Sequence, residues 1–168
     1  MRLAMRSFFI LAVVSILFCL EMNSYGQTKE DPITINFAYA AERIRRGDTW
    51  KIYLSVTDSE SKMHRVVCHV RQSGGEDAYS ASTIYLKKGM EKQFTGYFAL
   101  YTNFTLELDD FVLELSILDR AGNERKTLRF PLEFDRLAEP MKPLPPDMEK
   151  DLNRRIGTID VEWSHGLS

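Results

Sequence analysis

Oxygen-bearing side chains gather in two turns of the sequence, and their chemistry suits a calcium ion. Asp58 and Glu60 follow one alternating apolar stretch, and Asp119 and Asn123 belong to the turn before another. Ca²⁺ takes about six to eight oxygen ligands from carboxylates and carbonyls. If both turns emerge at the same end of a β-sandwich, they bring these side chains together as a calcium site. The alternative is that they are ordinary turn residues, whose side chains bond their own backbone.

Thiol and imidazole groups offer little chemistry in this pattern. Cys68 alternates with Val66 and Val70, so we expect a small buried residue rather than a reactive or intermolecular thiol. His64 shares that strand face, but four residues along a strand span about 13 Å, which is too far to grip one ion. The chain contains no Gly-x-Ser-x-Gly, His-Glu-x-x-His, P-loop or Gly-x-Gly-x-x-Gly frame. We therefore expect neither an enzyme nor a cofactor; the alternative, a small envelope hydrolase, needs a cleft with a perturbed carboxylate or histidine.

Alternating apolar residues define the elements that must position these groups. Successive side chains of a strand point to opposite faces, so period-two alternation predicts half-buried strands. Such stretches lie near residues 33–39, 50–56, 66–70, 82–86, 93–101, 111–118 and 128–134, with turn residues between them. The expected fold is all-β, a single antiparallel β-sandwich of about seven strands. Pro131 cannot donate to a ladder, so its side of the last strand should face an edge or a bulge.

The first residues have the order of a secretory signal. Arg2 and Arg6 precede an apolar run over residues 8–20, and a polar stretch ends at Gly26. The run is 13 residues long, whereas a membrane-spanning helix needs roughly 20. We expect cleavage near Gly26, a secreted or periplasmic mature chain, and no membrane span in it. An uncleaved anchor and a lipoprotein acylated at Cys19 are the alternatives.

A proline-rich stretch separates the predicted sandwich from a C-terminal segment. Residues 139–146 hold four of the six prolines and should be extended. Residues 147–155 predict a short helix, and residues 156–163 alternate, with Ile159, Val161 and Trp163 on one face. This tail either folds back along the sandwich or adds a strand or its tryptophan to a partner. The predicted organisation is a signal peptide (1–26), a sandwich (27–135), and a linker with a docking segment (136–168).

Two turns resemble a known class of domain. Gly47-Asp48-Thr49-Trp50 and Leu118-Asp119-Arg120-Ala121-Gly122-Asn123 are similar to the corresponding turns of bacterial immunoglobulin-like and fibronectin-type domains of exported proteins. The resemblance covers about 100 residues, 32–134, and implies an immunoglobulin-like sandwich. The chain departs from antibody-type domains because it lacks their paired cysteines and carries its tryptophan on the second predicted strand.

Charge and compartment narrow the class of partner. Removal of residues 1–26 changes the formal net charge from -2 to -3, so nucleic acid and anionic membrane are not expected as partners. We expect an exported, non-catalytic binding or structural module of the cell envelope that contacts another protein. The alternative is a calcium- or carbohydrate-binding adhesion module. Its aromatic contacts would come from Tyr39, Tyr53, Tyr85, Tyr97 and Tyr101.

Overall fold

The computed structural model describes residues 32–72, 81–102, 110–139, 144, 146 and 149–161. The expected signal segment and Trp163 lie outside these residues. Within them, no helix is both long enough and apolar enough to cross a bilayer.

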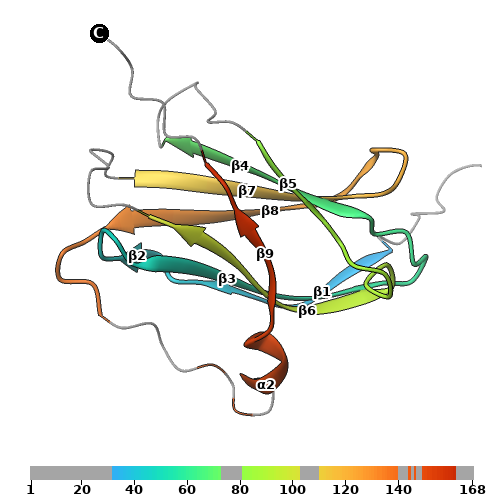
Figure 1. Ribbon diagram of the computed structural model, residues 1–168, viewed down its shortest axis with the longest axis horizontal. Helices are drawn as coiled ribbons and strands as arrows, with labels where there is room; N and C mark the ends of the chain where they lie inside the picture. The colour runs from blue at the N-terminus through green and yellow to red at the C-terminus, as the bar shows by residue number, and fades with distance from the viewer. Residues whose placement is uncertain are drawn as a thin grey trace, which may run out of the picture. The chain divides into compact units, whose positions relative to one another are not determined.

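Strands arranged in two sheets make up nearly all of the described structure (Figure 1). The four-stranded sheet has the order β1 (Ile33–Ala40), β3 (Thr49–Asp58), β6 (Gln93–Tyr101) and β9 (Arg155–Ile159). The five-stranded sheet has the order β2 (Arg43–Ile44), β8 (Glu124–Phe134), β7 (Asp110–Leu118), β4 (Arg65–Gln72) and β5 (Ser82–Tyr85). One short helix, α2 (Glu149–Leu152), precedes β9. The expected all-β sandwich is confirmed.

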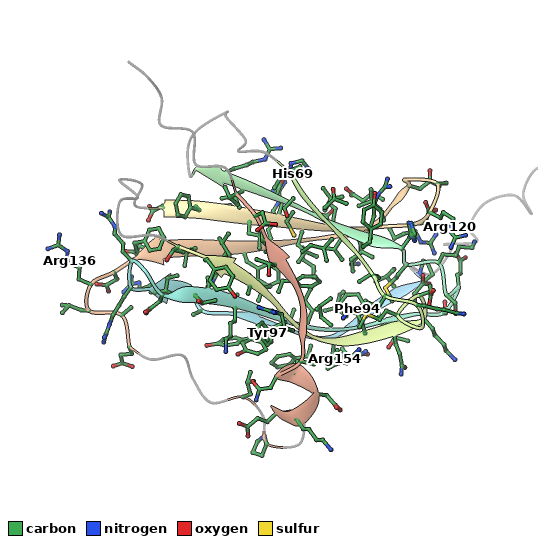
Figure 2. All side chains as sticks on the ribbon, viewed as in Figure 1. His69, Phe94, Tyr97, Arg120, Arg136 and Arg154 are labelled. Atoms are coloured by element: carbon green, nitrogen blue, oxygen red, sulfur yellow. The ribbon has the colours of Figure 1, made fainter. Side chains whose placement is uncertain are left out.

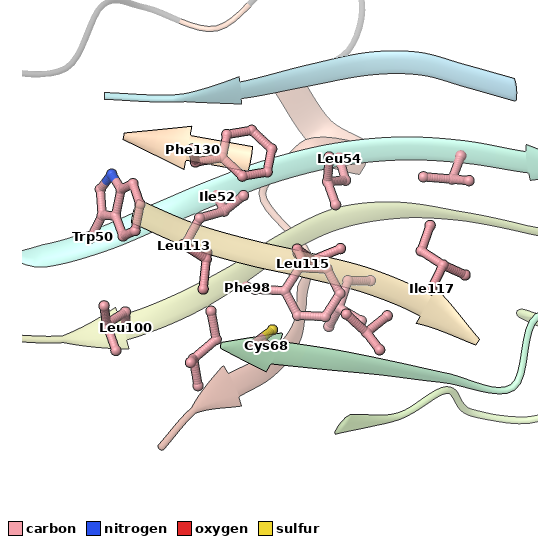
Figure 3. Close-up of a cluster of buried hydrophobic side chains, with 14 of the residues drawn as sticks. Trp50, Ile52, Leu54, Cys68, Phe98, Leu100, Leu113, Leu115, Ile117 and Phe130 are labelled. Carbon is pink, nitrogen blue, oxygen red and sulfur yellow. The ribbon is translucent and has the colours of Figure 1, made fainter. Parts of the chain in front are cut away.

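Apolar side chains from the two sheets meet between them, as the alternation predicted (Figure 3). The row that begins with Trp50 on β3 faces inward, and the Trp50 indole donates a hydrogen bond to the Ala41 carbonyl over 2.8 Å. Cys68 is 1% exposed, which confirms its expected burial. On β6, Phe98 and Leu100 point into the core.

Two pairings correct the expectation of a purely antiparallel sandwich. β2 runs parallel to β8, and β9 runs parallel to β6. β2 lies in a charged stretch that was expected to be a turn, where Ile44 alone is buried. Backbone bonds from Glu133 to the Glu42 carbonyl (2.8 Å) and from Asp135 to the Ile44 carbonyl (3.0 Å) hold it in place. One inward aliphatic residue and a few ladder bonds thus suffice for a strand that periodicity cannot signal.

The C-terminal segment folds back and closes one side of the sandwich. The Tyr97 N–H of β6 donates to the Arg154 carbonyl over 2.9 Å, at the junction of α2 and β9 (Figure 2). Further along, the Asp160 N–H donates to the Ser82 hydroxyl over 3.1 Å, and β9 contacts β5. The helix is shorter than predicted, because the chain joins the sheet from Arg155 onward. The tail therefore bridges an edge of each sheet.

Candidate functional site

The tail takes the first of its two expected alternatives over the described residues. Ile159 is 2% exposed and belongs to the core, and Val161 is partly buried against it. The predicted docking face is therefore corrected at Ile159, which is not available to a partner in this arrangement. The register shifts where β9 meets Tyr97 and Phe98, so Ile156 as well as Ile159 points into the core. A bulge of this kind breaks the period-two pattern.

Two glycines make room for the tail. A Cβ at Gly96 of β6 would collide with the Arg154 carbonyl oxygen and lie 2.7 Å from Ile156 Cδ1. A Cβ at Gly157 of β9 would lie 2.6 Å from Cγ2 of Ile84 on β5. The tail thus fits closely against both sheets, with one glycine on the receiving strand and one on the tail itself.

The predicted calcium residues do come near one another at one end of the sandwich, but the cation among them is Arg125. Its Nη2 lies 2.5 Å from Glu60 Oε2 and 3.8 Å from Asp58 Oδ1. Asp58 is fully buried, and its carboxylate oxygens accept N–H bonds from Glu60 and Lys62, each over 2.9 Å. Hydrogen bonds from Arg125 and then Lys62 lower the pKa of Glu60. The hydrogen bond with Glu60 first, and then the charges of Glu60, Asp58 and Asp119, raise the pKa of Arg125.

Asp119 and Asn123 bond each other across their own turn. The Asp119 carboxylate accepts the backbone N–H and the side-chain amide of Asn123, each over 2.9 Å. These bonds, the amide first, lower the pKa of Asp119. The pattern is that of turn residues serving their own backbone. Across the residues that the structure describes, no group of three or more His, Cys, Asp or Glu side chains is placed to hold a metal ion.

Arg125 could not be predicted from alternation, because a bulge on β8 determines where its side chain points. Lys126 pairs with Ile117 and Glu124 pairs with Leu118, so Arg125 is the extra residue on β8. Alternation predicts that Arg125 faces outward like Arg129, whereas a bulge redirects the side chain of the extra residue. No residue type in this stretch predicts the bulge.

Three tyrosines form a row on the outer face of the four-stranded sheet. Tyr39 pairs with Tyr53, which in turn pairs with Tyr97. The Tyr53 and Tyr97 rings lie 5.7 Å apart with their planes tilted by 48°. Tyr53 is 1% exposed, and α2 contacts β3 and β6. Burial, followed by the neighbouring hydroxyls, raises the pKa of Tyr53. A sugar platform needs exposed, coplanar rings, and this central ring is neither exposed nor coplanar with its neighbour.

The side of the sandwich opposite β9, where β1 meets β8, carries a groove. Its cavity of about 860 Å³ adjoins a second of about 340 Å³ that extends between β2 and the start of β3. We call these two cavities together the edge groove. Its apolar lining includes Ala40, Ala41, Trp50, Phe130, Pro131, Leu137 and Ala138. Its charged lining includes Glu42, Arg43, Arg129, Asp135 and Glu139.

Leu137 is presented to solvent at this groove on a fixed backbone. Its side chain is 86% exposed, more than that of any other large apolar residue among those described. Its N–H donates to the Asp135 carboxylate over 2.8 Å, and the Ala138 N–H donates to the Asp135 carbonyl over 3.1 Å. The Ala138 carbonyl accepts a bond from Arg45 Nε over 3.2 Å. Arg136, between Asp135 and Leu137 in the chain, projects away from the sheets (Figure 2).

Three of the charged side chains along the groove, Arg43, Asp135 and Arg129, form ion pairs. Arg43 lies 2.9 Å from Glu133 and 4.0 Å from Asp135, and Arg129 lies 2.7 Å from Glu114. The groove therefore combines an apolar lining with a rim of nearly balanced charge.

Almost nothing in the sequence predicts this groove. Residues 136–139 were assigned to the linker, and the groove depends on them. The one signal is Asp135, because aspartate favours turns in which it bonds its own backbone.

A scan of the chain against protein-family models finds no match, and a search of curated proteins finds no significant match either.

Proposed function

We propose that the chain is an exported, non-catalytic binding or structural module of the cell envelope, and that it binds another protein at the edge groove. The observation that carries this proposal is Leu137, an aliphatic side chain 86% exposed on a backbone held by hydrogen bonds. Protein interfaces concentrate their energy in a few large anchors surrounded by a polar rim. Leu137, the apolar lining and the paired charges around it match that composition.

Export rests on the N-terminal sequence. Arginines before an apolar run, followed by small residues at Ser24 and Gly26, are typical of a cleaved secretory signal. The mature chain then begins at Gln27 and acts outside the cytoplasm, in the periplasm or beyond it.

We further propose that the sandwich is of the immunoglobulin or fibronectin type. Domains of this type place strands A, B and E in one sheet and G, F and C in the other. The observed orders β1-β3-β6 and β8-β7-β4 occupy those places, and β5 extends the second sheet beyond C. Where strand D of the immunoglobulin type would pair with E, this chain has β9 of its tail. The proposal therefore rests on strand order, with the tail as a variation on it.

Recognition in the groove is favoured over addition of a strand to β1. The register of β1 against β3 shifts between Ile35 and Phe37. Bulges of this kind bend an edge strand and protect it from further pairing. A partner is therefore expected to place side chains against Leu137 and the apolar lining rather than extend the sheet.

Affinity capture from envelope extract tests the proposal. The bait is the mature chain from Gln27, beside Leu137→Asp and a matched control, Tyr85→Asp, which alters a 63% exposed side chain on β5, the opposite edge of its sheet. We expect one protein to bind the natural chain and Tyr85→Asp but not Leu137→Asp, with circular dichroism showing all three folded. Equal capture by Leu137→Asp would refute the groove as the site.

The same capture, repeated with a calcium chelator, distinguishes binding at the groove from binding at the predicted calcium site. If capture disappears on chelation and survives Leu137→Asp, binding belongs to the loop end that holds Asp58, Glu60, Asp119 and Asn123. If chelation has no effect, binding at the groove stands alone.

A further inference from the structure

The strand edges of this sandwich are protected in different ways, and β6 depends on the tail alone. An unpaired edge invites pairing with another chain, and bulges, prolines and short length prevent it. β1 has its bulge, and β5 is four residues long. The backbone N–H of Glu133 on β8 points outward, toward β2. The backbone nitrogen two residues earlier on the strand points the same way, and because it belongs to Pro131 it offers no hydrogen-bond donor there. That orientation confirms the edge position predicted for Pro131.

β6 lacks every one of these protections. Its nine residues contain no charge and no proline, and its register against β3 runs without a shift from Tyr101 to Gln93. Uncharged strands of high β-propensity are the segments that pair most readily between chains. On its other side, β9 pairs only with the part of β6 from Tyr97 to Leu100. Only this short parallel strand therefore occupies the edge.

β6 is also complementary to itself. The Tyr97 N–H points toward the β9 side, so Thr95 and Ala99, two residues away in each direction, point their N–H groups the same way. In an antiparallel pair centred on Tyr97, Phe98 of each copy lies opposite Gly96 of the other, on the core side. Aromatic residues opposite glycines stabilise such pairs. No like charges meet, because β6 has none.

We propose that the β6 edge is an interface between two copies of this chain, and that β9 is its cover. When the tail leaves, β6 of one copy pairs antiparallel with β6 of another and joins the two four-stranded sheets across a two-fold axis. Such an interface is isologous, so it closes at a dimer. It lies on the side of the sandwich opposite the edge groove and does not rest on the function proposed there.

The first test releases the tail without altering β6. Ile156→Asp with Ile159→Asp in the mature chain places two carboxylates in positions that are 9% and 2% exposed. Light scattering after gel filtration should then show a mass that rises twofold with protein concentration, while the natural chain stays monomeric. Adding Thr95→Pro, which removes an outward N–H beyond the pairing of β9, should restore the monomer, and Thr95→Val should not.

A second measurement keeps the natural tail and covers the case in which the double variant fails to fold. Tyr97 lies on the proposed two-fold axis, so Tyr97→Cys should form a disulfide between copies under mild oxidation, because the covalent bond retains the pairs that form each time the tail is briefly released. Thr95→Cys, on the same strand face but off the axis, should not. A folded double variant that stays monomeric, a dimer that persists with Thr95→Pro, or equal cross-linking by both cysteines would overturn the proposal.

Discussion

Replacing Gly157 with alanine tests how closely the tail fits against the five-stranded sheet. The added Cβ would lie 2.6, 3.2 and 3.3 Å from Cγ2, Cδ1 and Cγ1 of Ile84. Overfilling a packed site costs about 1–3 kcal/mol, so Gly157→Ala should destabilise the fold by that amount. Ile84→Ala removes the same three atoms and should cost about 1–3 kcal/mol, less than for a fully buried isoleucine because Ile84 is half-buried.

The double variant Gly157→Ala with Ile84→Ala measures the coupling free energy between the two positions. With the three colliding atoms gone, the new methyl group occupies space that Ile84 has left, so the costs should not add. We expect a favourable coupling of about 1–2 kcal/mol in urea unfolding followed by circular dichroism. Leu86→Ala is the control, because Leu86 also packs against the core yet supplies none of the three atoms nearest to the added Cβ. Additivity of Gly157→Ala and Ile84→Ala within about 0.5 kcal/mol would refute the packing of β9 against β5.

Three further predictions concern buried and titrating groups. Arg125→Met leaves the buried Asp58 carboxylate without its cation and should lower the free energy of unfolding by about 2–4 kcal/mol, whereas Arg129→Met, at a 73% exposed side chain, should cost less than about 1 kcal/mol. Because the pKa of Glu60 is lowered in the folded chain, its carboxylate stabilises the fold above the ordinary glutamate pKa, and this stability is lost as the pH falls through the folded value. Glu60→Gln should therefore flatten the fall in melting temperature between neutral and acid pH, and an unchanged slope would contradict this. Burial raises the pKa of Cys68 to about 12. The contribution of the neutral thiol to folding stability is therefore complete below the ordinary thiol pKa and is lost as the pH rises through the folded value of about 12. Mass spectrometry should find Cys68 alkylated only when urea unfolds the chain, and rapid labelling of the native chain would show that the thiol is accessible.

Long alternating stretches were readable from the sequence because burial repeats along them. The row from Trp50 and the burial of Cys68 follow from period two alone, since one face of each strand must meet the other sheet. The nearness of the two acidic turns was also predictable, because it follows from the order of strands in a sandwich.

Features that depend on a single residue or a distant partner were not readable. β2 has one buried side chain, Ile44, and so it has no period. β9 pairs in parallel with a strand far earlier in the chain, and the register shift beside Tyr97 turns Ile156 to the same side as Ile159. The bulge that turns Arg125 inward likewise depends on pairing with β7. Each of these depends on tertiary contacts that local alternation does not encode.

Binding of a protein at the edge groove is the central claim, and site-specific photo-crosslinking tests it most directly. A benzophenone amino acid replaces Leu137 in one strain of the source organism and Tyr85 in another, and intact cells are irradiated. We predict one light-dependent adduct of defined mass from position 137 and none from position 85. Adducts from position 85 alone, or none from position 137 when the protein is present at its natural level, would contradict the account.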